Sequence, residues 1–230
     1  MPRNGRSSAV AVIGLGRFGS ALAQELYEEG HEVLGMDTDE ALVDACKGFL
    51  THAAICNATD IEALRRHNVA DMPRAVVAIG TKLENSILAT ANLAELGVGE
   101  IWAKALTEQH RRILERIGAH NIVFPEGDAG RRVAHRIGLA VKEYLELEPG
   151  FVLAEMAVPA RLADKTLMEA GIREDHGVSV VCHKPAGGAF EVTTGHTVLG
   201  VDDLIVVAGT EAAVGRFASL AQHGTRRDAT

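Results

Sequence analysis

Apolar residues recur along the first half of the chain in short runs, and these runs alternate with stretches of helical periodicity. We expect the apolar runs to form strands at residues 9–13, 32–36, 51–55, 75–79, 101–104 and 121–124. We expect helices between them at residues 17–29, 40–43, 61–67, 85–96 and 109–117. Strands that alternate with helices predict a parallel, doubly wound α/β sheet of the Rossmann type, because right-handed crossovers place helices on both faces of the sheet.

The pattern changes after residue 126, where an apolar stripe at i+4 spacing begins. The stripe consists of Val133, Ile137, Val141 and Leu145. Such a stripe predicts a long helix that leads away from the sheet. The pair Pro149 and Gly150 then marks a boundary, because both residues favour turns.

Strands and helices are mixed differently beyond that boundary. We expect strands at residues 151–158, 178–183 and 204–208, helices near 167–170 and 211–220, and a hairpin turn at 185–188. This mixture predicts a small α+β subdomain. The expected organisation is a Rossmann nucleotide-binding domain at residues 9–126, a crossover helix and linker at 127–148, and the α+β subdomain at 151–222.

Composition narrows the class of protein. Of the 230 residues, 47% are hydrophobic and 23% are charged, which fits a well-packed globular protein whose polar ends, residues 1–8 and 224–230, fray. The net charge of −8 argues against a nucleic-acid partner, which would need a basic face. The three cysteines lack metal-site spacing and suit a reducing cytoplasm. No apolar stretch approaches the ~18 residues that span a bilayer, so a membrane role would act through a partner.

A glycine pattern directly follows the first expected strand and opens a helix. Gly14 permits a tight turn, Gly16 lets the backbone approach a pyrophosphate, and Gly19 lets the helix pack closely on the strand. The phosphates then lie at the helix N-terminus, where unpaired N–H groups and the helix dipole favour negative charge. The alternative is that these glycines merely shape a turn. The strand before them and the helix after them favour the phosphate-binding turn.

The acid at the end of the second strand selects among ligands. The carboxylate of Asp37 is placed to accept hydrogen bonds from ribose hydroxyls and to repel a 2′-phosphate. Nearby Asp39 is read as a helix N-cap, because a helical pattern follows it. The expected ligand is therefore NAD, ATP, ADP or a related adenine nucleotide with a free 2′-hydroxyl, and NADP is disfavoured.

Two classes of function share such a pocket, namely an NAD-dependent oxidoreductase and a regulatory nucleotide sensor. An oxidoreductase needs an acid or base beside the nicotinamide. The sequence has no Tyr-x-x-x-Lys pair, since the fourth residue after Tyr27 is His31 and the fourth after Tyr144 is Glu148. The C-terminal part is also small for a substrate domain. These observations favour the regulatory class, and an NAD-dependent oxidoreductase or NAD(H) redox sensor stays the alternative.

Several motifs in order along the chain resemble the RCK family, also called KTN. They are AVIGLGRFG at 11–19, HEVL at 31–34, NAT at 57–59, VAIG at 77–80, IWAKA at 101–105, IGA at 117–119 and PE at 125–126. The resemblance extends from about residue 10 to residue 220, and its C-terminal part is similar to the RCK C-terminal subdomain. Within the family, the chain most resembles the cytosolic regulatory subunits of Ktr/Trk-type potassium-uptake systems.

The resemblance implies a non-enzymatic gating subunit. Such a subunit dimerises, assembles into an octameric ring, and gates a membrane-embedded potassium-translocating subunit when ATP replaces ADP. It is cytoplasmic and lies at the inner face of the membrane through that partner. In some members of the family, the C-terminal subdomain also binds cyclic di-AMP between subunits.

The resemblance also assigns roles to individual residues. Arg17 reaches the γ-phosphate of nucleotide held by the neighbouring subunit, and Glu126 helps hold a divalent cation, Mg²⁺ or Ca²⁺, at the dimer interface. Phe18 and Ala58 join the nucleotide-binding residues, and the side chains of Asn57 and Thr59 are placed to meet the adenine edge or the ribose. Without the resemblance, Glu126 would be read as complementing a helix dipole. Asp128 is read as the N-cap of that helix, and Lys104 receives no role.

Overall fold

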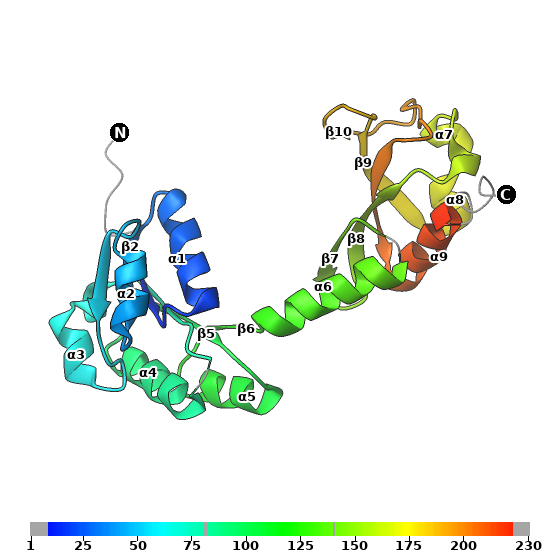
Figure 1. Ribbon diagram of the computed structural model, residues 1–230. Coiled ribbons are helices and arrows are strands. Elements are labelled where there is room, and N and C mark those ends of the chain that lie inside the picture. Colours follow the sequence, from blue (N-terminus) through cyan, green and yellow to red (C-terminus); the bar gives the residue numbers. More distant parts are fainter. Residues whose placement is uncertain (1–8, 81, 140, 223–230) are drawn as a thin grey trace. The chain divides into compact units, whose positions relative to one another are not determined.

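The computed structural model describes residues 9–80, 82–139 and 141–222 (Figure 1). The ends that the sequence predicts to fray, residues 1–8 and 224–230, lie outside these residues. The chain divides between Pro125 and Glu126 into two compact units, each with its own sheet. No helix among the described residues combines the length and the apolar character that crossing a bilayer requires.

The first unit is built on a six-stranded sheet with the order β3-β2-β1-β4-β5-β6. All neighbouring strands in it are parallel, as the alternation of strands and helices predicts. The strands are β1 (Ala9–Ile13), β2 (Glu32–Asp37), β3 (His52–Ile55), β4 (Arg74–Val77), β5 (Glu100–Lys104) and β6 (Asn121–Val123). The order reverses at β1, and in such sheets ligands bind at the carboxyl ends of the strands beside this reversal.

Helices cover both faces of this sheet. They are α1 (Arg17–Glu28), α2 (Glu40–Cys46), α3 (Ile61–Arg66), α4 (Leu83–Glu95) and α5 (Glu108–Arg116), with a 3₁₀ turn at Val69–Asp71. Ala11 and Ile13 of β1 pack in a cluster with residues of α3, α4 and α5, whereas Val10 and Val12 pack with residues of α1 and α2 (Figure 1). Successive strand residues point to opposite faces, so each face receives its own core. The doubly wound prediction is therefore confirmed.

The local signals for helix starts act as expected in this unit. The side chains of Asp39, Asp60 and Thr107 cap α2, α3 and α5 by accepting hydrogen bonds from backbone amides of the first turns. The interpretation of Asp39 as an N-cap is confirmed, since its carboxylate accepts from the amide of Ala41 at 2.9 Å.

The second unit contains a five-stranded antiparallel sheet with the order β10-β9-β11-β8-β7. The strands are β7 (Glu143–Glu148), β8 (Phe151–Ala157), β9 (Val178–Lys184), β10 (Glu191–Val192) and β11 (Leu204–Thr210). The helices are α6 (Pro125–Leu139), α7 (Leu167–Ala170), α8 (Ile172–His176) and α9 (Glu211–Gln222), with a 3₁₀ turn at Ala160–Leu162. Buried residues of β8, β11 and α9, among them Met156, Ile205 and Phe217, form its core. The α+β prediction is confirmed.

The extent of the crossover helix differs from the sequence prediction. The apolar stripe predicts helix as far as Leu145, but α6 ends at Leu139, and Leu145 lies in strand β7. A spacing of four residues fits both a helical turn and the two-residue period of a strand, so Val141 and Leu145 could not separate the two. The pair at 149–150 forms the turn of the β7–β8 hairpin, in which Glu148 pairs with Phe151.

The start of the crossover helix also needs a correction. Asp128 is not the N-cap, because α6 begins three residues earlier, at Pro125. Proline suits the first turn of a helix, where its missing N–H costs no hydrogen bond. Asp128 instead lies inside the first turn and pairs with Arg131 one turn later.

Candidate nucleotide site

The glycine turn between β1 and α1 has the geometry that the sequence predicts. Gly14 has a φ of +96°, a conformation that side chains disfavour, and its amide donates to the Met36 carbonyl at 2.7 Å. A Cβ at Gly19 would lie 1.8 Å from the Gly14 carbonyl oxygen, so only glycine lets α1 approach the turn this closely. A Cβ at Gly16 would meet nothing within 4 Å. That side of the turn is therefore open to a ligand.

The N-terminus of α1 is available to an anion. Gly16 is its N-cap residue and offers no side chain to the amides of the first turn. The backbone N–H groups at this end can therefore donate to phosphate oxygens, whose charge the helix dipole favours.

Asp37 lies at the end of β2, beside the glycine turn. Its Oδ2 accepts a hydrogen bond from the Leu15 amide at 2.7 Å, and its Oδ1 accepts from the Asp39 amide at 3.0 Å. Two backbone donors thus hold the carboxylate in one orientation. Each carboxylate oxygen can accept more than one hydrogen bond, so ribose hydroxyls can still be recognised.

The loop after β3 is ordered by its own polar side chains. Asn57 Oδ1 accepts from the Thr59 amide at 3.2 Å and from the Thr59 hydroxyl at 2.9 Å. From α4, Asn92 Nδ2 donates to the Ala58 carbonyl at 2.9 Å. This bond ties the loop to α4, so both can form walls of one site.

A cavity of about 350 Å³ opens at the carboxyl ends of β1, β2, β3 and β4. Six of the residues predicted from the sequence line it, namely Gly14, Gly16, Asp37, Asn57, Ala58 and Thr59. The lining also includes Lys82 and Asn85 at the start of α4, which sequence reasoning missed. Their position in the sequence could have indicated this, because they follow the fourth strand, and the carboxyl end of that strand lies at the same edge of the sheet as the glycine turn.

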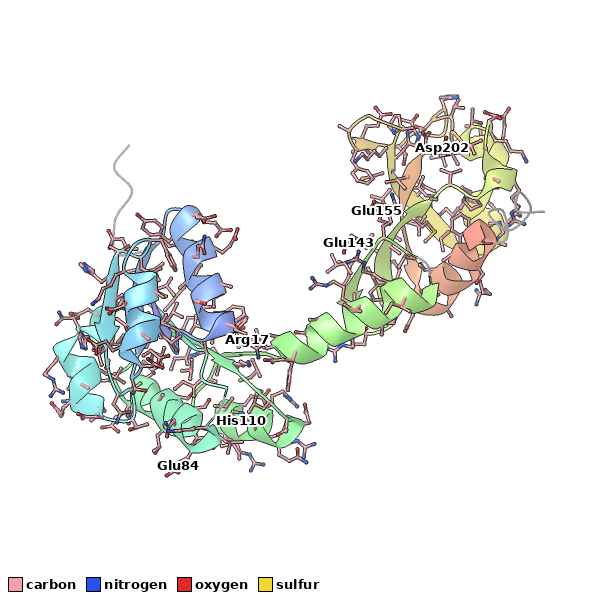
Figure 2. All side chains as sticks on the ribbon, viewed as in Figure 1. Arg17, Glu84, His110, Glu143, Glu155 and Asp202 are labelled. Atoms are coloured by element: carbon pink, nitrogen blue, oxygen red, sulfur yellow. The ribbon has the colours of Figure 1, made fainter. Side chains whose placement is uncertain are left out.

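Three predicted residues lie beside the turn and do not line this cavity. Arg17 opens α1 with an exposed side chain (Figure 2). Phe18 is half-buried, and the Lys104 ammonium lies 5.8 Å from the centre of its ring, within the range of a cation–π contact. Gly19 is buried and serves the packing described above.

Glu126 is the second residue of α6, and its side chain is exposed. Within the described part of the chain, no three or more His, Cys, Asp or Glu side chains gather as a metal site would need. One carboxylate supplies at most two of the six or more oxygens that Ca²⁺ takes. The remaining ligands of a cation at Glu126 would have to come from a phosphate, water or another subunit.

Burial shifts the pKa of Cys56 and of His110 in the first unit. Cys56 lines the cavity, and burial raises the pKa of its thiol, which therefore stays protonated at neutral pH. Burial likewise lowers the pKa of His110 on α5 (Figure 2), which keeps that imidazole neutral.

A second cavity, of about 420 Å³, lies in the C-terminal unit among α7, α8, β9 and residues 193–195. Leu167, Met168 and Ile172 give it apolar walls, and Arg173 and Glu174 add one charge of each sign. Apolar surface with a few polar groups is a common arrangement in small-molecule sites.

A glycine turn followed by a fixed acid, at the carboxyl edge of a doubly wound sheet, defines a Rossmann-type domain, here joined to a separate α+β unit. The TrkA-N domain model matches residues 10–125, and the TrkA-C domain model matches residues 152–222. The chain therefore belongs to the family of TrkA-N and TrkA-C domain proteins that includes the Ktr system potassium uptake proteins. The resemblance to RCK regulatory subunits is confirmed.

Two curated relatives match over most of their length. The Ktr system potassium uptake protein C of Bacillus subtilis (strain 168) is 37% identical over 93% of this chain and 97% of its own. The Ktr system potassium uptake protein A of Vibrio alginolyticus is 37% identical over 87% of this chain and 92% of its own. In these relatives both units are therefore present together, as they are here.

Solved structures support the fold. A structure of the GsuK channel bound to NAD matches with a TM-score of 0.63 and 18% identity, covering all of this chain and 46% of that chain. This chain thus spans less than half of the channel polypeptide. The match shows that the two units have the RCK fold.

Proposed function

We propose that this chain is the nucleotide-binding regulatory subunit of a potassium-uptake system, and that it switches a ring between ATP- and ADP-bound conformations. The cavity at the carboxyl edge of the first sheet carries the proposal, because it joins an open glycine turn to a fixed ribose-binding carboxylate. Full-length similarity to two Ktr potassium uptake proteins supports the transport role.

The proposal assigns the membrane step to another protein. A membrane-embedded potassium-translocating subunit moves the ion, and this chain binds to the cytoplasmic face of that partner as a homo-oligomer, in dimers that form an octameric ring. The partner's presence in Ktr systems is inferred from the names of the relatives. The chain works by binding and not by catalysis, as the similarity to Ktr potassium uptake proteins suggests.

The nucleotide is an adenine nucleotide with a free 2′-hydroxyl. Asp37 faces the cavity with its carboxylate already held by two amides, so a 2′-phosphate would meet a negative charge that cannot easily turn away. This chemistry admits ATP, ADP and NAD alike, and the GsuK structure with NAD supports the alternative of an NAD(H) sensor.

The nucleotide that accompanies the purified protein tests the proposal. We expect mass spectrometry to identify ATP or ADP, and calorimetry to show tighter binding of both than of NAD or NADH. Tight and selective binding of NADH would favour the redox-sensor alternative. A protein that binds none of these nucleotides would contradict the proposed function.

A divalent cation completes the proposed ATP state. We propose that Glu126 and the nucleotide phosphates share Mg²⁺ or Ca²⁺ at the dimer interface, because carboxylate and phosphate oxygens are the hard ligands that these ions prefer. A single exposed carboxylate fits this role only with ligands from elsewhere, as the site geometry indicates.

Replacing Glu126 with glutamine should remove the cation's effect on the ATP complex. In the wild-type protein with ATP, we expect added Mg²⁺ or Ca²⁺ to raise the melting temperature, and chelation to reverse the rise. In Glu126→Gln the rise should be absent, because the amide carries no charge. Asp128→Asn in the same helical turn is the matched control and should keep the rise. An unchanged rise in Glu126→Gln would remove Glu126 from the site.

The cavity of the C-terminal unit is the proposed place for cyclic di-AMP. Its apolar walls suit a purine and Arg173 suits a phosphate, which has to bind away from the Glu174 carboxylate in the same lining. Calorimetry of the full chain with cyclic di-AMP tests this part of the proposal, and the absence of any binding heat would count against it.

A further inference from the structure

The positions of the phosphate-binding turn and of the ribose-binding carboxylate in the nucleotide cavity indicate where the base of a nucleotide would lie. This step rests on the proposed function. Phosphates bind at the open turn beside Gly16, and the ribose binds at Asp37. The rest of the cavity continues to the loop at residues 57–59 and to the first turn of α4. The bond from Asn92, farther along α4, to the Ala58 carbonyl ties the loop to this helix. The base of a bound nucleotide therefore enters between that loop and α4.

Two amide side chains face this part of the cavity, and only one keeps its full hydrogen-bonding capacity. Asn57 Oδ1 already accepts two hydrogen bonds from Thr59, which leaves its NH₂ group to donate. Asn85 is half-buried and lines the cavity, and its side chain makes no hydrogen bond to any other residue in the described part of the chain. Its side chain can therefore donate and accept at the same time.

A free carboxamide matches the edge of adenine that carries N6 and N7. There the 6-amino group donates and N7 accepts, so one asparagine can make both hydrogen bonds. Guanine and hypoxanthine present two acceptors, O6 and N7, at the same edge, so a carboxamide can meet them only with its NH₂ group and its oxygen is left without a donor. A half-buried amide that loses one hydrogen-bond partner makes the binding free energy less favourable. Such a site rejects the wrong base in this way.

We propose that Asn85 is the residue that makes this cavity specific for adenine, by accepting from the 6-amino group and donating to N7. Lys82, one turn earlier on the same wall, supplies positive charge without base preference, because an ammonium donates to the acceptors of any purine. Asn85 thus determines which purine nucleotide binds. The glycine turn and Asp37 bind the phosphates and the ribose, which all of these nucleotides share.

Calorimetry of the full chain with ADP, GDP and IDP tests this role. We expect the wild-type protein to prefer ADP over IDP by about 5- to 150-fold, the range that one bidentate pair provides. Asn85→Ala should bring the ratio close to one, mainly through weaker ADP binding. Asn85→Asp should weaken all three nucleotides by its charge but keep the preference for ADP, since the carboxylate still accepts from the 6-amino group and repels O6.

Glu84→Ala is the matched control, because Glu84 lies in the same turn (Figure 2), is exposed and does not line the cavity. It should leave the ratio unchanged, and thermal unfolding of each variant checks that it folds. An Asn85→Ala protein that binds ADP and keeps the wild-type ratio would overturn the role of Asn85 while leaving the proposed function intact. A wild-type protein that binds no adenine nucleotide would instead overturn the proposed function.

Discussion

Replacing Gly19 with alanine should destabilise the first unit by about 3 kcal/mol or more and abolish nucleotide binding. The added Cβ would lie 1.8 Å from the Gly14 carbonyl oxygen and 3.0 Å from the Ala78 Cβ. The first neighbour is backbone, so no flexible side chain can move away to make room. Helix α1 would have to shift, and its N-terminus would leave the position in which it can bind phosphate.

Gly16→Ala is the matched control for this prediction. Its Cβ would meet nothing within 4 Å, and its φ of −64° suits any residue, so stability should change by less than about 1 kcal/mol. Its nucleotide affinity should nevertheless fall, because the methyl group occupies the space through which phosphate approaches. Chemical unfolding and calorimetry separate the two effects. If Gly19→Ala unfolds at the same denaturant concentration as the wild type, α1 does not lie as close to the turn as this prediction requires.

Replacing Arg17 with alanine should leave ADP binding nearly unchanged and remove the distinction between ATP and ADP. Arg17 is exposed at the first position of α1 and does not line the cavity of its own subunit. Its charge is therefore available to the γ-phosphate of a nucleotide in a second copy, as the resemblance to the RCK family implies. The expected readout is scattering from the oligomer, in which ATP and ADP should give different profiles for the wild type and one profile for the variant.

The size of this effect is consistent with a switch. Moving a two-state equilibrium from mostly closed to mostly open takes about 5.5 kcal/mol of differential binding. Shared among the eight sites of an octamer, this is roughly 0.7 kcal/mol for each site, which is less than the ~1.5–3 kcal/mol of one charge-assisted hydrogen bond. One arginine contact at each site is therefore sufficient for the switch. Arg17→Ala removes this contact from every site and can abolish the switch.

Arg116→Ala removes the same charge at a distant place and serves as the control. Arg116 lies in the last turn of α5, at the end of that helix away from the carboxyl edge of the sheet. Its replacement should preserve the difference between the ATP and ADP profiles. Persistence of that difference in Arg17→Ala would show that the γ-phosphate is sensed by another residue.

Much of the first unit was predictable, because its signals are local. The signals are the apolar period of each strand and helix, the glycines of the turn and the N-cap at Asp39. Each of them depends only on residues a few positions away along the chain. The Gly19 prediction also held, since packing a helix this closely on a strand requires a missing side chain. The strand β7 was missed, because a spacing of four residues suits both periods and only pairing with β8 decides between them.

By itself, the sequence determined the parallel sheet, the phosphate-binding turn and the acid at Asp37, since each follows from backbone geometry and residues that are close along the chain. Only the tertiary structure decided which side chains share the cavity. It placed Asn85 in the same cavity lining as the loop at residues 57–59, and it placed Arg17 outside that lining. The reason is that a wall built from the ends of four strands depends on how the helices pack across the sheet, and no local pattern encodes that packing.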